Sequence, residues 1–281
     1  MRTRFADLVG CELPLQLAAM GGVGTTELAA AVVLAGGMGM VPAGVPIASG
    51  SCGVNFLLPF RPSLEDIIEA ASQAPTVEFF YGDPRRDFVE AVHAEGGLVA
   101  WQIGSASEAT AAEDAGCDYV VAQGIEAGGH IRGNQGLDEL LAAVMDDVKI
   151  PVVAAGGVAT AERFVALIGA GAGAVRVGTR FVTSPESGAH PDYVSRLLEA
   201  KGEDTELSGW FNQGWDGAPH RVLRACIQAA MESGWRATVP PNTRTDRDVS
   251  DMAMYAGMGV GDVTSALPAA EVVRDLVRLL D

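Results

Sequence analysis

Eight short apolar segments recur between residues 13 and 178, and alanine-rich intervals separate most of them. Continuous apolar runs of this length are typical of strands buried on both faces of a parallel sheet. Several intervals end in glycine turns, and glycine commonly follows the last turn of a helix. A strand and a helix repeated in this way predict an α/β fold, a (β/α)8 TIM barrel. The predicted strands cover residues 13–19, 38–42, 54–58, 77–81, 98–103, 119–123, 151–155 and 174–178.

The alternative fold is a doubly wound open sheet, which usually contains fewer strands. One unit of the predicted barrel is incomplete, because only about nine residues, 43–51, separate the second strand from the third. A parallel crossover normally needs about a dozen residues or more. We therefore expect a shortened second βα unit in which a loop replaces the helix.

The last third of the chain departs from this alternation. Residues 1–200 are expected to form the barrel, whereas 201–250 contain every tryptophan except Trp101. We expect 201–250 to be a helical and loop insertion that covers the active site like a lid. Residues 251–281 end in apolar residues at helical spacing, and we expect this segment to pack back onto the barrel.

The composition restricts the partners and the compartment. The formal net charge of −17 repels nucleic-acid phosphates and anionic membrane surfaces, so we predict neither partner. The longest apolar stretch, 28–45, is interrupted by four glycines and a proline, and no signal peptide or membrane span is expected. The cysteines, at 11, 52, 117 and 226, have neither metal-ligand nor redox spacing, which predicts reduced thiols, no metal site and a cytoplasmic protein.

The loop after the sixth strand is the strongest candidate for a catalytic element. The sequence VVAQGIEAGGHIRG at 120–133 passes from an apolar run into a glycine-rich loop. Gly128 and Gly129 let the backbone approach a ligand, and His130 is the side chain there that can transfer a proton near neutral pH. We predict a catalytic role for His130, with Glu126 either orienting it or facing solvent. The other histidines, His93, His190 and His220, are expected to be surface or structural residues.

Glycines at the ends of the seventh and eighth strands predict a phosphate site. Barrels often bind phosphate in the loops after these two strands, through backbone N–H groups and the start of a short helix. The alternative is that these glycines form ordinary tight turns. The residues concerned are Gly156, Gly157, Gly178 and Thr179.

Two further groups predict where a flat cofactor ring would lie. Asn55, Gln102 and Gln123 are amides inside apolar strands, where they either bond to one another or bind the polar edge of a ring. Small residues after the first strand would let the ring lie against the backbone, and without a ligand they would form only a flexible turn. These residues are Ala19, Met20 and Gly21.

Together these residues resemble the nitronate monooxygenase family, formerly the 2-nitropropane dioxygenases. The resemblance covers nearly the whole chain and depends mainly on QGIEAGGH at 123–130, PVVAAGG at 151–157 and VGTRF at 177–181. Shorter matches are 53–55 and 254–260. The chain differs from the family pattern in its short second βα unit, and also at Met20 and Gly21, where many members have a proline–methionine pair.

The resemblance implies an FMN-dependent (β/α)8 enzyme with His130 at the position of the family's active-site histidine. The FMN phosphate would lie on the glycines after the seventh and eighth strands and on Thr179. The ring would lie against Ala19, Met20 and Gly21, with Asn55 and Gln123 at its polar edge.

The implied reaction is the oxidation of a nitronate, or of a nitroalkane after His130 removes its α-proton. With O2 it yields a carbonyl compound and nitrite, so the partners are O2 and a small-molecule substrate, and a homodimer is left open. The rival enzymes are FMN-dependent NAD(P)H reductases acting on enoyl-acyl-carrier-protein or quinones. The first of these tends to have Glu where this chain has Gln123. A non-catalytic flavin- or phosphate-binding barrel is the alternative from another class.

Overall fold

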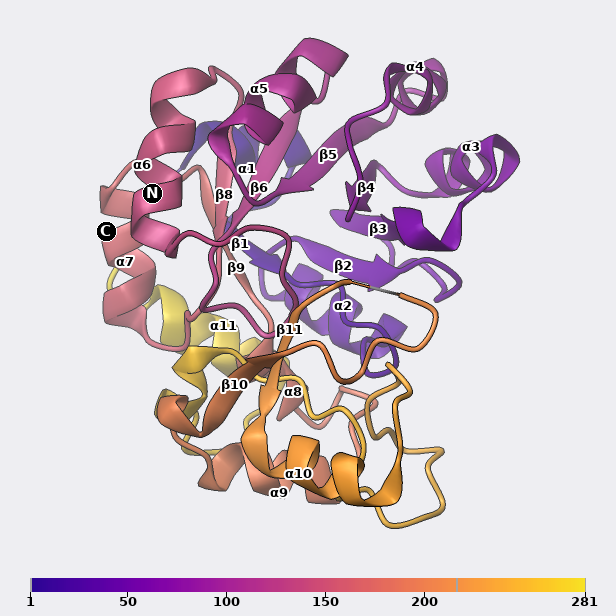
Figure 1. Cartoon of the computed structure of the whole chain (residues 1–281). Helices are drawn as coiled ribbons and strands as arrows, with labels where there is room; N and C mark the ends of the chain where they lie inside the picture. Colours follow the sequence, from indigo (N-terminus) through magenta and orange to yellow (C-terminus); the bar gives the residue numbers. More distant parts are fainter. Residues whose placement is uncertain (1, 216, 281) are drawn as a thin grey trace.

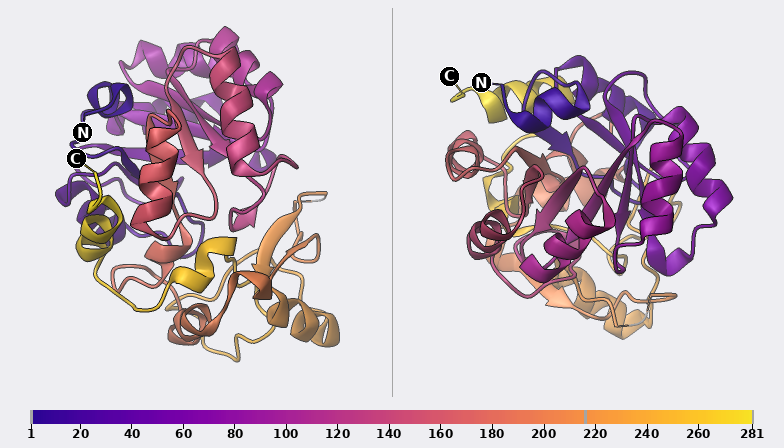
Figure 2. Two further views of the ribbon diagram at one scale, coloured as in Figure 1. Left: turned by 90° about the vertical axis from the view of Figure 1, so that its left-hand side faces the viewer. Right: turned by 90° about the horizontal axis from the view of Figure 1, so that it is seen from above.

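Eight parallel strands close into a barrel that helices surround (Figure 1, Figure 2). The computed structural model describes residues 2–215 and 217–280. Neighbouring strands follow the order β1-β9-β8-β6-β5-β4-β3-β2, and the ring closes where Met38 N donates to Leu15 O at 2.8 Å. The predicted barrel and its eight strands are confirmed. The strands are β1 (Leu15–Leu17), β2 (Gly39–Pro42), β3 (Cys52–Leu57), β4 (Thr76–Phe80), β5 (Leu98–Ile103), β6 (Tyr119–Gln123), β8 (Val152–Ala155) and β9 (Ala174–Val177).

Helices follow every barrel strand except β2. Residues 43–51 between β2 and β3 form turns and bends, as their short length predicted. No helix in the described ranges is long and apolar enough to cross a membrane, and all four cysteines are buried free thiols. The helices are α1 (Arg4–Val9), α2 (Thr26–Leu34), α3 (Leu64–Gln73), α4 (Arg86–Ala94), α5 (Ala106–Ala115), α6 (Leu137–Asp147), α7 (Ala161–Gly169), α8 (Thr179–Val182), α9 (Pro191–Glu199), α10 (Arg224–Ser233) and α11 (Ala269–Val277), with 3₁₀ turns η1 (Leu58–Phe60), η2 (Gly202–Asp204) and η3 (Met258–Asp262).

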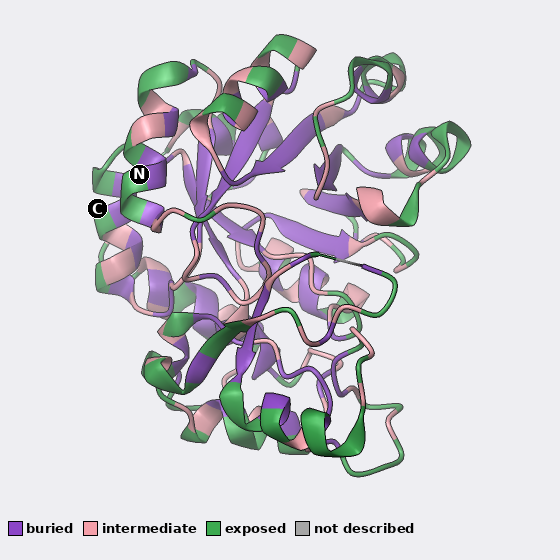
Figure 3. Ribbon diagram, in the orientation of Figure 1, coloured by how far each residue is buried: buried purple, intermediate pink, exposed green. Residues whose placement is uncertain are grey.

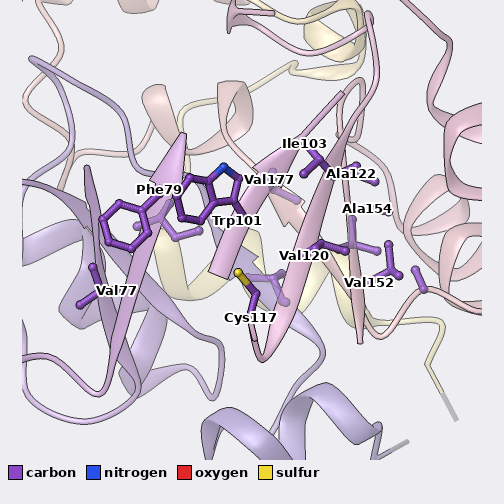
Figure 4. Close-up of a cluster of buried hydrophobic side chains, with 14 of the residues drawn as sticks. Val77, Phe79, Trp101, Ile103, Cys117, Val120, Ala122, Val152, Ala154 and Val177 are labelled. Carbon is purple, nitrogen blue, oxygen red and sulfur yellow. The ribbon is translucent and has the colours of Figure 1, made fainter. Parts of the chain in front are cut away.

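The strands direct alternate side chains outward to the helices and inward to the barrel axis. The outward side chains form an apolar layer, in which the rings of Phe79 and Trp101 lie 4.9 Å apart (Figure 4). Figure 3 shows that the strands are buried while the helices expose their outer faces. Inside the barrel, α1 fills the amino-terminal end, where Phe5 packs edge-on against Tyr119 at 5.2 Å. The opposite end of the interior is polar and forms the base of the cavity described below.

A small cap, residues 205–233, lies at the carboxyl ends of the barrel strands (Figure 1, Figure 2). We expected helix and loop in this region, but besides α10 it contains the strands β10 (Thr205–Ser208) and β11 (His220–Leu223). These strands pair antiparallel, and β11 also pairs with β7 (Gly129–His130) from the loop after β6. The cap strands are short and rich in polar residues, so their sequence lacks the apolar signal of the barrel strands. The cap therefore holds the His130 loop through backbone hydrogen bonds.

Candidate active site

The carboxyl ends of the barrel strands surround a cavity of about 380 Å³, which is within the range of cofactor and ligand sites, ~300–1,000 Å³. Every residue that the sequence analysis assigned to catalysis or cofactor binding lines this one cavity, whereas Glu126 does not, and the roles stay predictions. These residues are Ala19, Met20, Gly21, Asn55, Gln102, Gln123, Gly128, His130, Gly156, Gly157, Gly178 and Thr179.

The sequence analysis did not select two buried charged residues that line the cavity. Arg176 and Glu78 are 6% and 0% exposed, and Arg176 Nη1 donates to Glu78 Oε1 at 2.9 Å and to Gln102 Oε1 at 2.7 Å. Arg176 Nε donates to Gln16 Oε1 at 2.9 Å, and Asn55 Nδ2 donates to Glu78 Oε1 at 2.8 Å. The sequence did contain a signal for this pair: each of two apolar strands has one charged residue, Glu78 in β4 and Arg176 in β9. A charge buried in such a strand needs a partner. Asn55 and Gln102 thus bond within the barrel and also line the cavity.

Gln123 is the one of these three amides with a buried atom that lacks a partner among the described residues. Its Nε2 donates to the backbone oxygen of His130 at 2.9 Å. That oxygen can only accept, so the amide nitrogen must face it and the amide oxygen must face away. Gln123 Oε1 is buried and has no hydrogen-bond partner among the described residues. A bound group with an N–H donor would satisfy this oxygen.

His130 lies in an aromatic environment supplied largely by the cap. Its ring stacks on Trp215 with centroids 3.8 Å apart and an interplanar angle of 13°. The rings of His220 and Tyr255 lie 5.1 Å and 5.8 Å from it. His130 Nε2 is buried and has no hydrogen-bond partner in the described part of the chain. Trp215 and Tyr255 line the cavity with His130, and the sequence analysis had selected neither.

His130 and the neighbouring His220 both favour the neutral state. Burial, reinforced by His220, lowers the pKa of His130 from 6.5 to about 3, because a low-dielectric environment disfavours the charged ring. Burial also lowers the pKa of His220. His220 Nδ1 lies 3.1 Å from the oxygen of Ala218, and its Nε2 accepts from Phe211 N at 3.2 Å. These bonds fit a neutral, structural His220, as its sequence position predicted.

Glycines from three loops meet beside the predicted phosphate site. Gly156 and Gly157 have φ values of 130° and 66°, which side chains rarely adopt, whereas Gly178 has φ −119° and needs glycine only for space. The Cβ of a residue replacing Gly259 would lie 2.7 Å from Gly157 O. Gly257 N donates to Thr179 Oγ1 at 3.0 Å. The stretch 257–259 therefore completes this wall. The sequence analysis noted 254–260 as a matching stretch but gave it no role.

Glu126 does not orient His130; it is partly exposed and caps the next helix. Its carboxylate accepts from Leu137 N at 3.0 Å, at the start of α6, and among the described residues it makes no hydrogen bond to His130. A carboxylate at this position satisfies a free N–H group and interacts favourably with the helix dipole. Glu126 thus fixes the loop before α6 rather than the histidine.

The family model for nitronate monooxygenase matches residues 64–278. The chain belongs to the nitronate monooxygenase family. It is therefore an oxidoreductase of a family of flavin enzymes. A nitronate monooxygenase of Pseudomonas aeruginosa is 30% identical, in an alignment that covers 100% of this chain and 99% of the relative.

Other proteins that are similar to this chain have names that describe different activities. A 5-hydroxy-7a-methyl-1-oxo-octahydro-1H-indene-4-carboxyl-CoA dehydrogenase of Rhodococcus jostii is 33% identical, with coverage of 83% of this chain and 68% of the relative. Among solved structures, FabK of Thermotoga maritima has a TM-score of 0.84 at 29% identity, covering 99% of this chain and 96% of that one. A nitroalkane oxidase of Streptomyces ansochromogenes has a TM-score of 0.79 at 30% identity, with coverage of 98% and 97%.

Proposed function

We propose that this family member oxidises alkyl nitronates with FMN and O2 to a carbonyl compound and nitrite. Gln123 is the residue on which the proposal mainly rests. Its amide nitrogen holds the backbone of His130, while its oxygen stays unpaired in the cavity wall. One side chain thus joins the histidine loop to the polar wall that a cofactor ring would meet.

The residues present fit FMN. Gln123 Oε1 needs an N–H donor, which the pyrimidine edge of a flavin offers. A Cβ at Gly21 would meet nothing within 4 Å, so this segment leaves room for a ring beside Ala19 and Met20. Gly156, Gly157, Gly178 and Thr179 would hold the phosphate, as sequence reasoning proposed. When bound, FMN supplies the capacity to accept electrons from the substrate and pass them to O2.

The low pKa of His130 favours a nitronate over a neutral nitroalkane as the substrate. A general base works best when its pKa lies near the operating pH, and a pKa of about 3 makes His130 a weak base for a neutral nitroalkane. A nitronate arrives already deprotonated and needs only orientation in a site that excludes water. We therefore propose nitronates as the main substrates and His130 as the residue that positions them.

The runner-up function is an FMN-dependent reduction of an enoyl thioester or a quinone by NAD(P)H. The structural likeness to FabK favours this alternative. The charge of the cavity opposes it, because Arg176 is the one Lys or Arg among its described lining residues and is paired with Glu78. Dinucleotides and CoA carry several phosphates, and outside the glycine site proposed for the FMN phosphate the described lining residues offer no unpaired Lys or Arg for them. A non-catalytic flavin-binding barrel is the remaining alternative, and the intact His130 loop opposes it.

Anaerobic stopped-flow measurements on the FMN-loaded protein test this proposal. Oxidised enzyme is mixed with propane-2-nitronate or with NADH while the flavin absorbance is followed, and nitrite is assayed in air. We expect flavin reduction and nitrite formation with nitronate, and slow or absent reduction with NADH. Fast bleaching by NADH together with no response to nitronate would establish the reductase instead.

A further inference from the structure

The indole of Trp215 is the clearest unexplained polar group of the cavity. Trp215 is 6% exposed and lines the cavity, and its Nε1 is buried without a hydrogen-bond partner among the described residues. An indole N–H can only donate. Leaving such a buried group unpaired is unfavourable, so this position calls for an occupant that presents an acceptor atom.

Surrounding rings hold the indole in one place. His130 stacks on one face at 3.8 Å, and Tyr81 and Phe60 contact it edge-on at centroid distances of 4.9 Å and 5.7 Å. The backbone N of Trp215 donates to Asn212 O at 2.8 Å. The indole is therefore fixed against His130, whose Nε2 is the second unpaired buried nitrogen of the same stacked pair.

We infer that Trp215 is a substrate-positioning residue whose indole N–H, together with His130 Nε2, binds the two oxygens of an oxyanion such as a nitronate. The inference rests on the proposed function for the identity of the substrate, and it takes His130 as the neutral tautomer with its proton on Nε2, since a ring nitrogen can either donate or accept. The described lining residues offer no free Lys or Arg for the anion, because Arg176 is the one such residue there and already bonds to Glu78, Gln102 and Gln16. Neutral N–H groups in a dry site are well suited to an anion with spread charge.

The test follows the indole N–H signals of the FMN-loaded protein by NMR. The four tryptophans give separate signals in protein labelled with ¹⁵N-tryptophan, and Trp215→Phe identifies the signal of Trp215 by its loss. Isobutyrate, an inert carboxylate with the size and the two oxygens of propane-2-nitronate, is then titrated. Trp101 and Trp210 serve as internal references, since their indoles already donate to Gly82 O at 2.9 Å and Trp235 O at 2.8 Å.

We expect the Trp215 signal to move downfield with saturation while the two reference signals stay in place. Trp215→Phe keeps an aromatic ring against His130 and removes the donor, so affinity for isobutyrate should fall about tenfold or more. Trp235→Phe is the matched control, because Trp235 Nε1 is also unpaired but lies outside the cavity lining. That variant should bind isobutyrate as the unchanged protein does.

The inference is overturned if isobutyrate binds without moving the Trp215 signal, or if Trp215→Phe binds it equally well. It is also overturned if loading FMN into the apoprotein produces the whole shift, because the acceptor is then the cofactor. The inference is likewise overturned if the enzyme turns over nitronate but does not bind isobutyrate. A Trp215 shift in an enzyme that fails to oxidise nitronate would keep the oxyanion site and reject only the proposed function.

Discussion

Arg176 and Glu78 form an ion pair inside the barrel although they lie 98 positions apart in the sequence. The pair is buried and extends through Gln16, Gln102 and Asn55. A buried ion pair is not by itself a source of stability, but removing one partner leaves the other charge without compensation. The polar base of the cavity therefore depends on both residues at once.

Glu78→Leu should destabilise the fold by about 3–5 kcal/mol, because it leaves the Arg176 guanidinium buried without a counter-charge. Glu78→Gln should cost less, since an amide oxygen still accepts from Arg176. Urea unfolding followed by circular dichroism measures both. The exposed pair Arg224–Glu206 is the control, where Glu206→Gln should change stability by less than about 1 kcal/mol. A Leu variant as stable as the Gln variant would contradict the role given to the pair.

The stability of the protein should depend on pH through His130. Its folded pKa is lowered to about 3, so between about 6.5 and 3 the unfolded chain binds a proton that the folded chain does not. This contribution is fully present above pH 6.5 and decreases as the pH falls, by up to ~1.4 kcal/mol per unit. The stability difference between the unchanged protein and His130→Asn should therefore shrink from pH 7 to pH 4.5. A constant difference would show that His130 titrates normally in the folded state.

His130→Asn should spare FMN binding and impair turnover. If His130 only positions the substrate, kcat/KM should fall by similar factors for propane-2-nitronate and for neutral 2-nitropropane. If it acts instead as a general base, the loss should be ~10²–10⁴-fold with the nitroalkane and much smaller with the nitronate. Nitrite formation in air measures both rates, and the flavin content of each preparation is the control.

Substitutions of the glycines at the predicted phosphate site should separate backbone strain from loss of space. Gly157→Val should weaken both folding and FMN retention, because φ is 66° and the new Cβ would lie 3.0 Å from the Cβ of Glu126. Gly178→Val should release FMN with a smaller effect on stability, since its φ is −119°. Gly169→Ala is the control, because a Cβ there meets nothing within 4 Å. Full FMN occupancy in both valine variants would place the phosphate elsewhere.

The sequence predicted those elements whose burial produces a recognisable pattern of apolar residues along the chain. Strands covered on both faces are continuous apolar runs, which is why β5 and β6 were predicted at the residues where they occur. The carboxyl ends of such strands must meet at one end of a barrel, and this constraint alone brought His130, Gly157 and Asn55 to one cavity.

Other parts of the site depend on contacts that no local pattern encodes. The strands β10 and β11 read TELS and HRVL and lack apolar alternation, so they resembled loop. Trp215 was one of several tryptophans in a segment without a regular pattern, and its stacking on His130 is a contact between residues 85 positions apart that no local pattern encodes. The partnership of Glu78 with Arg176 likewise required the closed barrel.

The pairing of β7 with β11 restricts how this enzyme can diverge. His130 lies opposite His220, and Gly129 lies opposite Arg221. A register shift of one residue would turn the side chains of one strand to the other face of this small sheet, so His130 would lose its orientation without being mutated. A change in the number of residues between Trp215 and His220 would likewise move Trp215 away from the His130 ring on which it stacks. Insertions and deletions in the cap should therefore be excluded from that stretch, although it lies in a loop.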